Sequence, residues 1–152
     1  MAQINKSSDY FNTKLYTGNG TTQSITGVGF QPDLVWIKAR SNTYNHGLFD
    51  VVRGASKKLY SDLTDAETTN SGVSAFDSDG FTVGSDLGGN GSGSTYASWN
   101  FLASNTTASN TDGSITSTVS ANTTSGFSIV SYTGTGANAT VGHGLGVAPK
   151  MI

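Results

Sequence analysis

The residues best suited to acid–base or metal chemistry are sparse in this chain. It has two histidines, His46 and His143, no cysteine, and ten acidic residues, of which Glu67 is the single glutamate. A metal site needs several converging ligands, and without cysteine the two histidines would need aspartate partners, which the local spacing gives little reason to expect. Both histidines are therefore predicted to lie in turns or at the surface, without a metal ion.

The sequence also lacks the motifs of covalent catalysis. The absence of cysteine excludes a thiolate nucleophile, and none of the many serines lies in a Gly-x-Ser-x-Gly or Ser-x-x-Lys motif. No carboxylate pair stands near an aromatic platform, as glycoside hydrolysis would need. We predict no catalytic residues and no cofactor, and we expect that the protein is not an enzyme.

One acidic segment, Asp77-Ser78-Asp79-Gly80, resembles the opening of a calcium loop. The later oxygen ligands and the closing glutamate of such a loop are missing. The favoured interpretation is a hairpin turn in which the aspartates accept hydrogen bonds from backbone amides and the glycine takes a positive φ. A weak calcium site at Asp77 and Asp79 is kept as the alternative.

Aromatic side chains could bind a ligand by stacking. Tyr44, in the polar segment 41–46, is the best candidate for exposure, and with Asn45 and His46 it forms our candidate binding segment. Trp36 and Trp99 lie within apolar runs, and we predict that both pack in the core. The glycine-rich stretch 87–93 lacks the ending of a phosphate-binding loop and is expected to be a flexible surface loop.

Composition excludes several classes of partner. Charged residues make up 12% of the chain and the formal net charge is −2, so no basic patch is available for nucleic acid. The N-terminus lacks the apolar core of a signal peptide, and no run is long enough for a membrane helix. We expect synthesis in a cytoplasm, no nucleic-acid binding and no membrane insertion.

The remaining residues form short apolar or alternating runs bounded by Gly, Asn, Asp or Pro, a pattern typical of strands and turns. The most hydrophobic run, residues 34–37, is predicted to be a central strand. Residues 61–70 lack an apolar stripe and are expected to form a loop. The other expected strands are residues 10–16, 24–28, 47–52, 72–76, 80–83, 96–102, 115–119 and 127–132. This spacing predicts an all-β fold, an antiparallel β-sandwich of jelly-roll or lectin-like character.

The chain contains one internal repeat. Residues 16–35 and 132–152 both begin Tyr-Thr-Gly-x-Gly, place an apolar residue nine positions after the tyrosine, and end with a proline before two apolar residues. The second copy is one residue longer, and it stops where the first continues into Trp36. We therefore expect a β-sandwich module at 1–131 and the start of a second copy at 132–152, in a native chain built from tandem copies.

Several segments of the sequence resemble repeated modules in large virion proteins of marine bacteriophages. They are residues 9–20 (DYFNTKLYTGNG), 28–38 (VGFQPDLVWIK), 79–84 (DGFTVG) and 110–122 (NTDGSITSTVSAN). The resemblance implies a tail, fibre or particle-surface protein with a lectin-like β-sandwich, and it brings no established functional residues. Folding in a host cytoplasm without disulfides agrees with this class.

The leading functional hypothesis is a tail-fibre or adhesin-type module that attaches to the tail or recognises the host surface. A capsid decoration (cement) protein and a carbohydrate-binding, lectin-like domain are the alternatives, and a polysaccharide-cleaving enzyme is the least favoured. The expected location is the virion. The expected partners are other virion proteins, further copies of the chain in a homo-oligomer (a trimer, as in fibre proteins) and a host-surface glycan.

Overall fold

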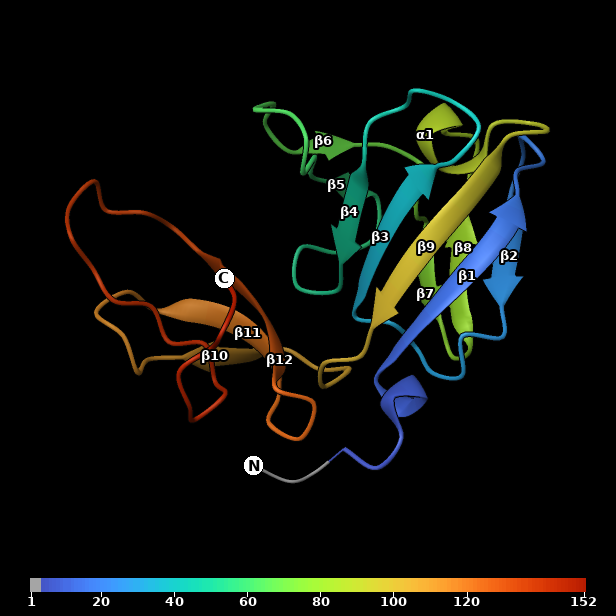
Figure 1. Ribbon diagram of the computed structural model, residues 1–152. Helices are drawn as coiled ribbons and strands as arrows, with labels where there is room; N and C mark the ends of the chain where they lie inside the picture. Colours follow the sequence, from blue (N-terminus) through green and yellow to red (C-terminus); the bar gives the residue numbers. More distant parts are fainter. Residues whose placement is uncertain (1–3) are drawn as a thin grey trace.

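The computed structural model describes residues 4–152, and residues 11–101 contain the two antiparallel sheets of a sandwich. The first is a four-stranded sheet in the order β1 (Phe11–Thr17), β9 (Thr95–Phe101), β3 (Leu34–Ala39), β4 (Gly47–Asp50). The second is a three-stranded sheet in the order β2 (Gln23–Thr26), β8 (Gly80–Val83), β7 (Ala75–Asp77). Figure 1 shows β2, β7 and β8 behind the four-stranded sheet. The predicted all-β, antiparallel β-sandwich is confirmed.

A single apolar cluster lies between these two sheets. Strand β3 alternates along its length, so that Val35, Ile37 and Ala39 are buried while the residues between them are half-buried. The cluster is completed by residues of both sheets and of their connections, namely Ile25, Phe49, Val73, Phe81, Val83 and Tyr96. The position of β3 between β9 and β4 confirms that residues 34–37 belong to a central strand.

A third sheet forms the C-terminal part of the chain. Its strands are β10 (Ala108–Asn110), β11 (Ser117–Asn122) and β12 (Phe127–Tyr132), paired antiparallel in that order. The chain then returns along this sheet, where Val141 makes a parallel bridge with Ile115 and the Ser117 hydroxyl donates to the Gly142 carbonyl. In Figure 1 this sheet stands beside the two-layer part.

Buried groups join the C-terminal sheet to the sandwich. Asp33, at the start of β3, is fully buried, and its Oδ2 accepts the amide N–H groups of Ala103 (2.6 Å) and Asn105 (3.1 Å). Phe101 stacks on Phe127 of β12, with ring centroids 5.1 Å apart. Both contacts cross from the sandwich into the segment that carries the third sheet.

Short elements complete the described chain. A 3-10 helix, η1 (Ser7–Asp9), precedes β1, and the two-residue strands β5 (Lys57–Lys58) and β6 (Thr68–Thr69) pair with each other. The expected loop at residues 61–70 is a loop up to β6. No helix among the described residues is long and apolar enough to cross a membrane.

The prediction of a flexible surface loop at residues 87–93 is wrong. Residues Leu87–Asn90 form a short helix, α1, and Asn90 is fully buried. The Asn90 amide group donates to the carbonyls of Gly84 (2.8 Å) and Thr21, and its Oδ1 accepts the N–H of Asn19 (3.0 Å). A buried asparagine with these partners ties the glycine-rich segment to the turn after β1.

Candidate functional site

The outer face of the four-stranded sheet carries two tryptophans side by side. Trp36 of β3 and Trp99 of β9 are directly paired in the register of the two strands, and their ring centroids are 5.4 Å apart at an interplanar angle of 53°. Because side chains alternate along a strand, both indoles point away from the core that Val35, Ile37 and Tyr96 enter. We call Trp36, Trp99 and their neighbours on this side the outer aromatic face.

The prediction that Trp36 and Trp99 pack in the core is therefore wrong. Both indoles are half-buried, and neither belongs to the buried apolar cluster. The sequence carried a signal for this arrangement, because Trp36 shares its side of β3 with the charged Lys38. On β9 the buried side is instead formed by Tyr96 with the polar residues Ser98 and Asn100.

His46 holds one of the two indoles in place. Its Nδ1 accepts a hydrogen bond of 2.8 Å from Nε1 of Trp36, so the neutral imidazole carries its own proton on Nε2. The backbone N–H of His46 donates in turn to the carboxylate of Asp62, at 3.1 Å and 3.3 Å to the two oxygens. The Trp36 ring is thus fixed through contacts on two separate loops.

Lys38 organises the polar border of the outer aromatic face. Its ammonium donates to the carbonyls of Ala39 (2.9 Å) and Tyr44 (2.8 Å), and it also reaches that of Asn42 (3.4 Å). These bonds fold the segment after β3 against the sheet, with the Tyr44 side chain 36% exposed. Asn45 is exposed on the same segment.

Of the sequence-predicted binding residues, His46 contacts Trp36, and Tyr44 and Asn45 lie on the segment that precedes His46. The structure brings His46 onto Trp36, with ring centroids 5.6 Å apart, and anchors Tyr44 through Lys38. The binding role of Tyr44, Asn45 and His46 stays a prediction. Sequence reasoning missed the two tryptophans beside them, which supply the broadest flat surfaces of the site.

The edge of the face lies on β1. Register places Thr13 beside Trp99, and it places Leu15 and Phe11 in the neighbouring rows. Leu15 is 65% exposed and Phe11 is 38% exposed. Phe11 also packs on Phe101, at 4.7 Å between ring centroids. Apolar surface therefore continues from the tryptophan pair to the sheet edge.

Of the second pair of sequence-predicted residues, Asp77 ends β7 and Asp79 lies in the turn to β8, as expected for a hairpin. Oδ2 and Oδ1 of Asp79 accept the amide N–H groups of Gly27 (2.9 Å) and Gly29 (2.6 Å). These hydrogen bonds hold the pKa of Asp79 below its usual range. The Thr82 hydroxyl donates a hydrogen bond of 2.7 Å to Oδ2 of Asp77.

The role of Asp77 and Asp79 as metal ligands stays a prediction. Within residues 4–152 no group of three or more His, Cys, Asp or Glu side chains is arranged to hold a metal ion. The hydrogen-bonding role that the sequence favoured for this turn is present, but the amides belong to a segment some fifty positions earlier in the chain, not to the turn itself.

The outer aromatic face offers two kinds of interaction to a ligand. The indoles provide flat apolar surfaces, and Nε2 of His46 provides a hydrogen-bonding group. The neighbouring Tyr44, on the segment that Lys38 anchors, adds an exposed phenol.

Comparison with known proteins identifies a family without assigning an activity. Residues 6–152 match the family described as Domain of unknown function (DUF7483). No curated protein and no solved structure matches the chain.

Proposed function

We propose that this chain, which belongs to the DUF7483 family, is a host-recognition module of a bacteriophage virion that binds a surface glycan through its outer aromatic face. The observation that carries the proposal is the pair of half-buried indoles of Trp36 and Trp99, with ring centroids 5.4 Å apart, on the side of the four-stranded sheet that faces away from the core. Exposed aromatic clusters on a sheet surface mark interaction sites because exposure of large apolar groups is otherwise unfavourable.

The chemistry of the face favours a sugar. A pyranose ring has an apolar face of C–H groups that stacks on indole or phenol rings, while its hydroxyls need hydrogen-bonding groups at the border. Trp36 and Trp99 supply the rings, and the Tyr44 and His46 side chains supply the border.

Charge favours an uncharged glycan over an anionic polymer. The Lys38 ammonium on this face is already shared among three backbone carbonyls. The whole chain carries eight basic and ten acidic residues, so attraction of a polyanion has little electrostatic basis. A neutral saccharide needs no such attraction.

The assignment to a virion is supported by the resemblance of residues 9–20, 28–38, 79–84 and 110–122 to repeated bacteriophage modules. In this proposal the module belongs to a tail fibre or adhesin that assembles as a homo-oligomer, a trimer by analogy with fibre proteins. Several copies would raise the avidity of individually weak sugar contacts.

The test is binding of the full chain to a glycan array, followed by calorimetry with the best saccharide. We expect Trp99→Ala to weaken binding by about tenfold or more, because one stacked ring is lost. Tyr132→Ala is the matched control, since Tyr132 is a 57% exposed aromatic residue on β12, outside the face. Absence of any bound glycan, or equal losses in both variants, would refute the proposed function.

A second candidate is supported by the edge of the sheet. Leu15 on the edge strand β1 is 65% exposed, which favours a protein contact such as docking onto the tail or clamping of capsid subunits. Leu15→Lys should abolish incorporation into particles if this contact is the main function. The copy number in purified particles separates the two locations, because a low number favours the tail and a high number favours the shell.

A further inference from the structure

The two repeated segments share a backbone conformation at their glycines. The pairs are Gly20 and Gly136 (φ 76° and 74°), Gly27 and Gly144 (78° and 73°), and Gly29 and Gly146 (92° and 70°). A positive φ at three matched positions is unfavourable for residues with a Cβ atom. The repeat that is visible in the sequence is therefore also a repeat of local structure.

In the first copy this glycine turn holds a carboxylate. The amides of Gly27 and Gly29 donate to the two carboxylate oxygens of Asp79, and the amide between them, on Val28, donates to the Asp79 backbone carbonyl at 3.2 Å. Three successive N–H groups thus bind one solvent-exposed aspartate. Consecutive amides of this kind form a concave site for an anion.

In the second copy only the middle one of the three corresponding amides has a hydrogen-bond partner among residues 4–152. The middle amide, on Leu145, donates to Nδ1 of His143 at 3.1 Å, so the histidine replaces the backbone carbonyl of Asp79. The flanking amides of Gly144 and Gly146 make no hydrogen bond within the described part of the chain. The two positions that bind carboxylate oxygens in the first copy are therefore open in the second.

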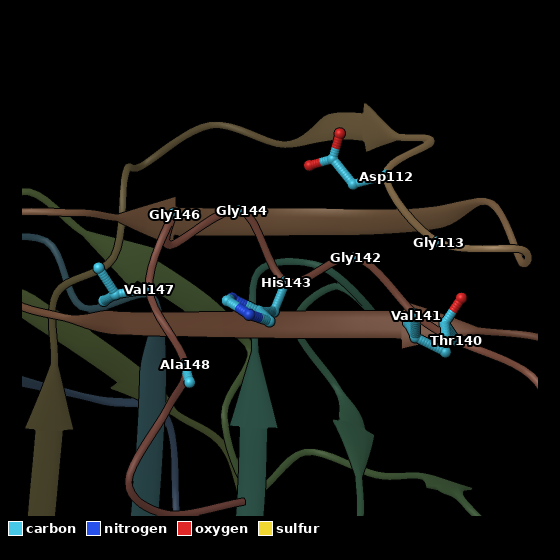
Figure 2. Close-up of a pocket in the computed structure, with 10 residues that line it drawn as sticks. All are labelled: Asp112, Gly113, Thr140, Val141, Gly142, His143, Gly144, Gly146, Val147 and Ala148. Atoms are coloured by element: carbon cyan, nitrogen blue, oxygen red, sulfur yellow. The ribbon is translucent and has the colours of Figure 1, made fainter.

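Gly144 and Gly146 line a surface pocket. Figure 2 shows the turn of Gly144 and Gly146 lying, in this view, between Asp112 and the His143 ring, with Val147 beside it. The pocket has a volume of about 430 Å³. His143 accepts the Leu145 amide on Nδ1, so its neutral ring carries a proton on Nε2.

We propose that Gly144, Leu145 and Gly146 form a second carboxylate cradle, which binds the aspartate or glutamate side chain at the tip of a β-hairpin. The first copy provides the precedent, because its ligand is the turn aspartate of the β7–β8 hairpin. Asp112 lines the same pocket with its carboxylate bonded to Nδ2 of Asn110 at 3.1 Å, and its negative charge weakens the affinity for the incoming carboxylate.

The test is an amide NMR titration of the full chain with a cyclised peptide of residues 75–83, AFDSDGFTV. We expect the amide protons of Gly144 and Gly146 to move downfield, and the same peptide with Asp79→Asn to bind about tenfold more weakly. Asp112→Asn should tighten binding. Sodium acetate at equal concentration distinguishes the source of the carboxylate, because equal shifts with acetate would exclude the hairpin partner.

A variant pair checks the location of the site. Gly146→Ala strains a backbone with φ of 70° and should weaken peptide binding, whereas Gly136→Ala imposes similar strain (φ 74°) in equally open space outside the cradle. The proposal is overturned if the Gly144 and Gly146 amides do not shift with the aspartate peptide, or if the asparagine peptide shifts them equally. These amide shifts in the unmodified chain decide the matter even where a variant fails to fold.

Discussion

Nε1 of Trp36 donates a hydrogen bond of 2.8 Å to Nδ1 of His46, ten residues further along the chain. This contact couples the central strand β3 to the loop that precedes β4. It sets the orientation of one half of the tryptophan pair, so the geometry of the outer aromatic face depends on a residue that has no place in the core.

Replacement of His46 should loosen Trp36 without unfolding the protein. We expect His46→Ala to lower the free energy of unfolding by about 0.5–1.5 kcal/mol, the usual worth of one hydrogen bond, and to shift tryptophan fluorescence to longer wavelength. His143→Ala is the control, because His143 bonds to Leu145 in the C-terminal part of the chain. Identical emission spectra for His46→Ala and the unmodified protein would contradict the assigned role.

The buried side chain of Asn90 should be the most sensitive polar position of the glycine-rich segment. Asn90→Ala removes the partners of Gly84, Thr21 and Asn19 at once, and we expect a loss of roughly 2–4 kcal/mol in urea denaturation. The exposed Asn45→Ala is the matched control and should change stability by less than about 0.5 kcal/mol. Similar midpoints for the two variants would mean that α1 is not anchored by this side chain.

Asp33 should make the protein less stable as pH rises. Burial raises the pKa of its carboxyl above the ordinary value, against the opposing effect of the N–H groups of Asn105 and Ala103. The folded state therefore holds the proton more tightly than the unfolded state, and stability falls between the ordinary aspartate pKa and the raised folded one.

The corresponding measurement is the free energy of unfolding between pH 3 and pH 8. Asp33→Asn keeps an oxygen acceptor for Ala103 and removes the titration, so the decrease with rising pH that is due to this group should disappear. An unchanged pH profile in Asp33→Asn would show that this carboxyl has the same pKa in both states.

Asp79 should make the protein more stable as pH rises, in contrast to Asp33. The amides of Gly29 and Gly27 lower its pKa, so its contribution to stability is present above the ordinary aspartate value and is lost as pH falls through the lowered folded pKa. Asp79→Asn should reduce stability at neutral pH and flatten the acid limb of thermal melts recorded from pH 2 to pH 7. Asp65→Asn, an exposed aspartate, should do neither. An acid limb equally steep in Asp79→Asn would rule out the cradle as its origin.

The pattern of neighbouring residues was enough to predict several strands and turns of the sandwich. The apolar run at β3, the alternation in β9 and the Asp-Gly turn before β8 are properties of neighbouring residues, and each occurs where the sequence predicted a strand or a turn. The repeated glycines are a second example, since a positive φ at a turn is a local requirement that glycine meets.

The sequence by itself determined that this chain forms short antiparallel strands, because strand and turn preferences act between adjacent residues. Only the tertiary structure decided which side of each strand is covered. Trp36 and Trp99 lie outside the core because the three-stranded sheet packs on the opposite side, and Asp79 meets Gly27 and Gly29 only because β2 pairs with β8. Both relationships join residues far apart in the chain, which local pattern does not encode.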